Sequence, residues 1–151
     1  MTIDPRFFQM RRDALDAFRP PAKLALADWI QASVFLPCSI AAQPGRMRLW
    51  KPQIEIANAI GDDTLERVSI LKSARVGATQ LMVGAIGHFV ENDPSPVLCV
   101  VPAEADARHL MVSVIDPTFQ ESPSLRAALT EDSSGRDTIL HRHFAGGSLS
   151  I

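Results

Sequence analysis

One stretch of the sequence restricts the fold of this chain more than any other. A short apolar, β-rich run at 68–71 leads into the turn KSARVGAT at 72–79 and then into an apolar helical segment at 79–90. A second apolar run, 97–101, precedes another helical segment at 103–115. This order predicts a βαβα unit with two adjacent parallel strands and with the first helix packed across them. Because 97–101 is apolar throughout, we expect it to be covered on both faces.

Helical segments precede this unit. Apolar residues recur at helical spacing at 4–18, 22–34 and 54–60. Residues 35–50, which follow the second of these helices, look irregular and hold Pro37, Pro44 and Gly45. We therefore divide the chain into an N-terminal helical segment, 1–36, and a domain that occupies 37–151.

A β-hairpin is expected near the end of the sequence. Residues 116–136 are polar and rich in turn residues, with one short helix predicted at 123–130. Residues 138–144 and 148–151 alternate between polar and apolar around a Gly-Gly turn at 146–147, which is typical of a hairpin. The sequence stops within the second of these strands, so we interpret its end as a cut within a domain.

Composition excludes several classes of protein. The 151 residues carry 15 basic and 17 acidic side chains, a net charge of −2, which excludes a coat protein that binds nucleic acid through total charge. No apolar run reaches the roughly 18–20 residues of a membrane helix, and the N-terminus lacks the apolar core of a signal peptide. Cys38 and Cys99 lie in apolar settings and are predicted to be buried thiols. A cytoplasmic location without membrane contact fits these features.

The turn at 72–79 has the form of a phosphate-binding loop. Such a loop follows a strand, presents main-chain N–H groups to an anion and opens a helix. The usual pattern is G-x-x-x-x-G-K-[ST]. Here the eight positions are Lys72, Ser73, Ala74, Arg75, Val76, Gly77, Ala78 and Thr79. The second glycine and the hydroxyl are in place, whereas Lys72 replaces the first glycine and Ala78 the usual lysine.

Two interpretations of these eight residues are open. An ordinary strand–helix turn with surface cations is one of them, and a phosphate site is the other. The position of the turn favours the phosphate site, because nucleotides bind at the first strand–helix turn of an open sheet.

Several segments in the same order resemble one family. ILKSARVGATQL resembles the deviant Walker A segment of the large terminase subunit of lambda-like tailed phages, the GpA family, in which the loop lysine starts the motif. Four further segments resemble parts of the same family. Residues 27–37 resemble its DW/LP segment, and 43–60 its PG-then-P segment. Residues 94–110 resemble the strand after the loop helix, and 137–151 a hairpin with F-x-G-G-S-L. The resemblance covers residues 25–151.

The resemblance implies an α/β fold and an ATP-dependent activity. The fold would be a partial P-loop NTPase, a parallel sheet with flanking helices. The activity would be that of a motor ATPase that packages double-stranded DNA into the prohead, with an associated endonuclease. Lys72 and Arg75 would meet the β- and γ-phosphates of ATP, the amides of 72–79 would cradle them, and Thr79 would bind Mg²⁺. Gln53 lies where related motors contact adenine, at a position where many relatives have an aromatic residue.

The resemblance also implies partners and a missing part. The N-terminal region would bind the small terminase subunit. The motor would contain further copies of the chain and would contact the portal of the prohead, within the bacterial host cytoplasm. The family's Walker B Asp-Glu pair and its nuclease domain are not found in the sequence. We therefore expect 37–151 to be an incomplete ATPase domain that does not hydrolyse ATP alone.

Other functions remain open. One alternative is an inactive module that only docks to the small subunit, and another is a helicase-like P-loop ATPase. The helix at 4–18 is either a docking element or an ordinary packing helix. His141 and His143 share a strand face that suits either a metal or a solvated, DNA-facing edge. The basic residues at 46, 48 and 51 either contact DNA or solvate a loop, and we interpret Glu104 and Asp106 as helix-start residues.

Overall fold

A computed structural model describes Arg11, residues 23–130 and residues 138–151. Apart from Arg11, the predicted helix at 4–18 lies outside the described residues, as does most of the N-terminal segment 1–36. Within the described part, the chain combines helices with a small mixed sheet, so the α/β class is confirmed. No helix in this part of the chain is long and apolar enough to cross a membrane.

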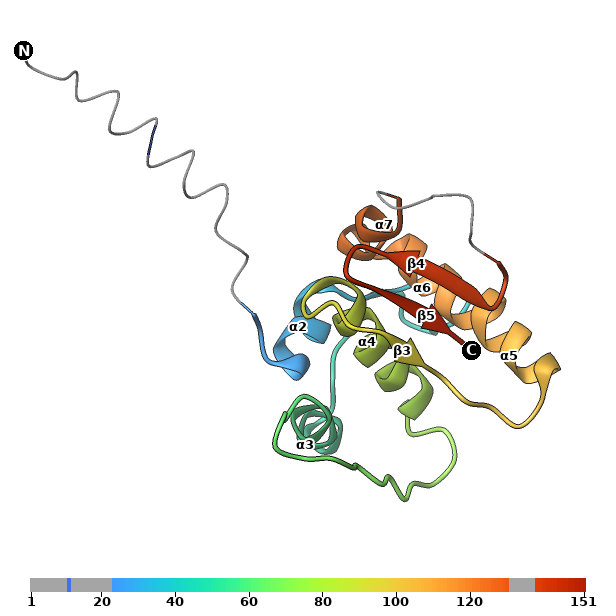
Figure 1. The fold of residues 1–151 in the computed structure, drawn as a ribbon. Coiled ribbons are helices and arrows are strands. Elements are labelled where there is room, and N and C mark those ends of the chain that lie inside the picture. The colour runs from blue at the N-terminus through green and yellow to red at the C-terminus, as the bar shows by residue number, and fades with distance from the viewer. Residues whose placement is uncertain (1–10, 12–22, 131–137) are drawn as a thin grey trace, which may run out of the picture.

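Helix α4 (Ala78–Glu91) lies at the centre of the molecule (Figure 1). It packs against α2 (Leu26–Ser33), α3 (Lys51–Ile60) and α7 (Pro123–Thr130), and also contacts strand β5 (Gly147–Ser150). Eight of its residues are buried, from Leu81 to Val90. The apolar helix predicted at 79–90 is therefore confirmed as the core of the fold.

Two glycines let α2 and α7 approach α4 closely. A Cβ atom on Gly84 would lie 3.0 Å from Ile30, and one on Gly87 would lie 2.9 Å from Leu125 and 3.1 Å from the ring of Trp29. The indole N–H of Trp29 also donates a 2.6 Å hydrogen bond to Glu91. Close packing and this bond together hold α2 on the central helix.

The C-terminal hairpin is confirmed. Strand β4 (His141–Phe144) pairs antiparallel with β5, and the turn between them has Gly146 at φ +93°, in the left-handed region that favours glycine. Strand β5 also pairs in parallel with β3 (Val97–Leu98), so the sheet order is β3-β5-β4. A separate antiparallel pair joins β1 (Phe35–Leu36) to β2 (Gly45–Arg46).

The expected strand at 68–71 is absent, and the expected pairing with 97–101 is wrong. Residues 61–75 are exposed and form neither helix nor strand, and Figure 1 draws this segment as an open loop below α4. The partner of Val97 is Leu149 instead, and the Cys99 N–H bonds to the Ser150 carbonyl at 2.8 Å. A short apolar run is compatible with a strand, but its partner is decided by contacts distant in sequence.

Burial of 97–101 on both faces is also wrong. The strand is limited to two residues, and the side chains of Leu98 and Val100 are mostly exposed. Among the described residues, β5 is the neighbour of β3 on one edge, and no strand lies on the other.

The segment after β3 is more helical than expected. Helix α5 (Glu104–Leu110) continues through a π-helical turn, η1 (Met111–Ile115), into α6 (Asp116–Glu121). The Asp116 N–H bonds five residues back to the Met111 carbonyl, and the next residue, Pro117, has no N–H to donate. The prediction of turns from 116 onward is therefore wrong for 116–121, whereas the predicted helix at 123–130 is confirmed as α7.

The two cysteines are less buried than expected. Cys38 is exposed and Cys99 is half-buried, and both are free thiols. The prediction of two buried thiols is therefore wrong, most clearly for Cys38, which lies in the turn after β1. Burial raises the pKa of the Cys99 thiol, which lowers its thiolate fraction near neutral pH.

We expect iodoacetamide at pH 8 to modify Cys38 several-fold faster than Cys99, because the thiolate is the reactive form and must also be accessible. Mass spectrometry of tryptic peptides over time measures both rates in one sample. In urea the two rates should become equal. Equal rates in the folded chain would contradict the burial of Cys99.

Candidate functional site

The turn at 72–79 forms an exposed loop that ends at the start of α4. Residues 72–75 are exposed, and 76–78 are half-buried. Two residues have left-handed backbone conformations, Arg75 at φ +60° and Gly77 at φ +74°. A left-handed conformation is uncommon for a residue with a side chain such as Arg75, and strained residues of this kind concentrate at functional sites.

Gly77 is the N-cap residue of α4, and among the described residues no side chain caps this helix end. The Leu81 N–H bonds back to the Gly77 carbonyl at 3.1 Å, so the N–H groups of the first turn point out of the helix end. An uncapped N-terminus of a long helix favours an anion through these N–H groups and the helix dipole.

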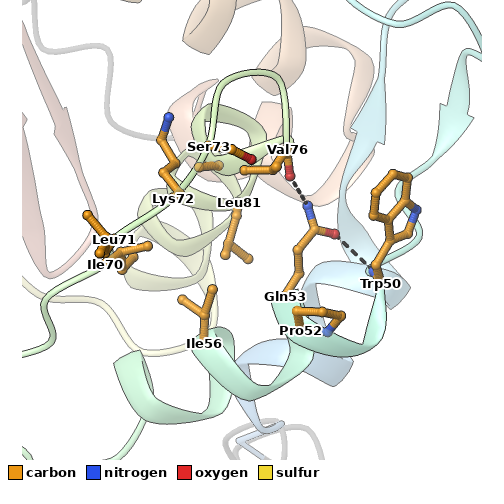
Figure 2. Close-up of a pocket in the computed structure, with 11 residues that line it drawn as sticks. Trp50, Pro52, Gln53, Ile56, Ile70, Leu71, Lys72, Ser73, Val76 and Leu81 are labelled. Carbon is orange, nitrogen blue, oxygen red and sulfur yellow. Dashed lines mark hydrogen bonds between the residues drawn. The ribbon is translucent and has the colours of Figure 1, made fainter.

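Gln53 connects the loop to helix α3 (Figure 2). Its side-chain Nε2 donates a 2.9 Å hydrogen bond to the Val76 carbonyl, and its Oε1 accepts a 2.9 Å bond from the Trp50 N–H. A Cβ atom on residue 77 would lie 2.8 Å from Nε2, so glycine at this position leaves room for the amide. The loop therefore rests on the first turn of α3.

Two hollows adjoin this contact. An apolar pocket of about 300 Å³ has walls of Trp50, Pro52, Ile56, Ile70, Leu71 and Leu81. A second hollow, of about 630 Å³, lies on the Arg48, Arg75 and Gly77 side. Trp50, Gln53 and Val76 border both hollows. The size of the apolar pocket is at the lower end of small-molecule sites.

The structure brings most of the predicted site residues together. Lys72, Ser73, Val76 and Ala78 line the apolar pocket, together with Gln53, and Arg75 and Gly77 line the second hollow. Ala74 and Thr79 are exposed and line neither. In Figure 2 the ammonium of Lys72 points away from Gln53, toward the outer side of the loop.

The histidines of the hairpin face each other. The Nε2 atoms of His141 and His143 are 3.1 Å apart, and His141 Nδ1 lies 2.6 Å from the Ser150 hydroxyl. Their shared strand face is confirmed. Within the described ranges no group of three or more His, Cys, Asp or Glu residues is placed to hold a metal ion.

Two of the charged residues considered in the sequence, Glu104 and Arg46, contact neighbouring side chains. Glu104 and Asp106 lie in the first turn of α5, and Glu104 accepts a 2.7 Å bond from Arg108, so the helix-start interpretation is confirmed. The guanidinium of Arg46 stacks over the ring of Phe35 at 5.5 Å. The two interpretations of residues 46, 48 and 51, contact with DNA or a solvated loop, both stay open.

Sequence reasoning missed the contact between Gln53 and the loop. Gln53 was considered as a neighbour of adenine. A local signal was present, because glutamine three residues after a helix N-cap reaches back to the N-cap N–H, as Gln53 does to Trp50. The bond to Val76 joins residues 23 positions apart and has no local signal.

Comparisons with known proteins bear on this site. A family model described as the ATPase domain of phage terminase large subunit gpA matches residues 41–151. The terminase large subunit of Escherichia phage lambda is 36% identical over 110 residues, 73% of this chain and 17% of that protein. The terminase large subunit of Enterobacteria phage P21 is 30% identical over 105 residues, 70% of this chain and 16% of that protein. No solved structure matches the chain significantly. The chain thus spans a small part of the length of these relatives.

Proposed function

Because this chain belongs to the ATPase-domain family of phage terminase large subunits, gpA, we propose that it binds ATP with Mg²⁺ and forms part of a motor that packages double-stranded DNA. The observation that carries the proposal is the loop at 72–79. It turns through left-handed residues at 75 and 77 into the N-terminus of helix α4, which no described side chain caps.

Each part of the site has a proposed role. The N–H groups of 76–79 and the α4 dipole bind the phosphates, because both favour negative charge. Lys72 and Arg75 supply cations from the exposed part of the loop, and the Thr79 hydroxyl ligates Mg²⁺. The apolar pocket beside Trp50 and Pro52 receives the base, since its walls are apolar and it adjoins the loop.

The wider assignment follows from the family. We assign 37–151 to a P-loop ATPase domain and 1–36 to a helical segment that contacts the small terminase subunit. In the whole protein the motor contains several copies of the chain, contacts the portal of the prohead in the host cytoplasm, and is linked to an endonuclease. The lambda and P21 relatives are named terminase large subunits, which supports a role in DNA packaging.

Replacing Thr79 with alanine is expected to weaken ATP binding about tenfold when Mg²⁺ is present, an effect in the range of a lost bond to a charged group. With EDTA the same substitution should have little effect, because the hydroxyl acts through the metal. Isothermal titration calorimetry on the 151-residue chain measures both affinities.

Thr79→Ser is the matched control, since it keeps the hydroxyl and should bind like the wild type. An equal loss with Mg²⁺ and with EDTA would show that Thr79 is not a metal ligand. Absence of ATP binding by the wild-type chain would overturn the proposed function itself.

A further inference from the structure

The side-chain amide of Gln53 is held at both ends by main-chain atoms. Nε2 donates to the Val76 carbonyl and Oε1 accepts from the Trp50 N–H, each at 2.9 Å. The two partners fix the orientation of the amide, because a carbonyl cannot pair with Oε1 and an N–H cannot pair with Nε2. Gln53 is also half-buried, so water competes weakly for these bonds.

The contact lies at the point where the loop becomes a helix. Val76 precedes Gly77, the N-cap residue of α4, and Gly77 has a left-handed backbone. A Cβ atom at position 77 would approach Nε2 to 2.8 Å, so the amide fills the space between α3 and the loop. The amide thus supports the peptide units whose N–H groups open α4.

We propose that Gln53 is a positioning residue of the phosphate-binding loop and does not read the nucleotide base. This inference rests on the proposed function, because it assigns a role within the same site. By holding the Val76 carbonyl, Gln53 fixes the direction of the adjoining N–H groups before the ligand arrives. A preorganised set of donors binds an anion more tightly than one that must be ordered on binding.

A residue that positions the loop and a residue that reads the base affect different sets of ligands. If Gln53 positions the loop, its loss weakens every ligand that carries a triphosphate, whichever base is attached. If Gln53 reads adenine, its loss weakens ATP alone. Inorganic tripolyphosphate has no base and therefore distinguishes the two roles.

The experiment compares Gln53→Glu and Gln53→Met with the wild-type 151-residue chain. The carboxylate of the first variant still accepts from the Trp50 N–H but cannot donate to the Val76 carbonyl. The second variant has a similar length and no polar group. Asn58→Asp, an exposed amide on the same helix, is the control for added charge. Calorimetry with ATP, GTP and tripolyphosphate, each with Mg²⁺, gives nine variant affinities and three reference affinities.

We expect both Gln53 variants to weaken all three ligands by similar factors, about three- to tenfold, the effect of one lost hydrogen bond. Asn58→Asp should leave the three affinities unchanged. Melting temperatures without ligand show whether each variant is folded, and Gln53→Met decides the question if Gln53→Glu is not.

A loss confined to ATP, or no loss, would overturn the inference while the proposed function stands. A wild-type chain that binds none of the three ligands would overturn both.

Discussion

Lys72→Ala is expected to lower the affinity for ATP and Mg²⁺ by one to two orders of magnitude, because a hydrogen bond to a charged group is worth about 1.5–3 kcal/mol. Lys72 opens the loop in place of the first glycine of the usual pattern, and the position that normally carries the lysine is Ala78. Within the loop, Arg75 is the other cation. Calorimetry on the 151-residue chain measures the change.

Arg67→Ala is the control for this substitution, since Arg67 is an exposed cation in the same irregular segment but lies outside the loop. It should bind ATP like the wild type. Lys72→Arg should recover part of the affinity, because it keeps the charge but not the shape of the ammonium. An affinity that is the same in Lys72→Ala and in the wild type would exclude Lys72 as a phosphate ligand.

Trp29→Ala is expected to lower the free energy of unfolding by about 3–5 kcal/mol, the usual effect of removing a large buried aromatic side chain. Trp29 is 2% exposed, lies against Gly87 and donates its indole N–H to Glu91. Its loss would leave a cavity between α2 and α4. Urea unfolding followed by circular dichroism gives the change.

The second tryptophan is the matched control. Trp50 is 70% exposed, so Trp50→Ala should change stability by less than about 0.5 kcal/mol. Trp29→Phe should retain most of the packing and lose the indole hydrogen bond. Similar losses in Trp29→Ala and Trp50→Ala would contradict the packing of α2 against α4 through Trp29.

The elements that the sequence predicted well are those with local signals. Helix α4 has an apolar pattern along its length, α3 ends before Gly61, and the hairpin has alternating strands around a glycine turn. Each signal lies within the element that it specifies, so local periodicity and turn chemistry suffice.

The pairing of the strands could not be predicted in this way. The run 97–101 is apolar and was assigned a partner at 68–71, because parallel strands joined by one helix are usually neighbours. The structure pairs Val97 with Leu149 instead, and 68–71 stays exposed. Strand choice depends on how well distant side chains pack together, which the pattern of a single segment does not contain.

The candidate site was predicted in part for the same reason. The loop residues are contiguous, so the sequence places them before a helix, and the structure agrees for Gly77 and α4. The support by Gln53 comes from another helix, through a bond to a main-chain carbonyl. A carbonyl is present at every residue, so no pattern of side chains reveals which one is bound.

The ladder between β3 and β5 has a consequence for folding during synthesis. It joins Val97 to Leu149, which are 52 positions apart, with α5, α6 and α7 between them. Closing so long a loop costs chain entropy before any contact compensates it, whereas the helices form from neighbouring residues. On the ribosome the α4 region therefore emerges and becomes helical while β3 is still unpaired, because its partner β5 is synthesised last among the described elements. The sheet is the late step, and the helical part can assemble around α4 before it.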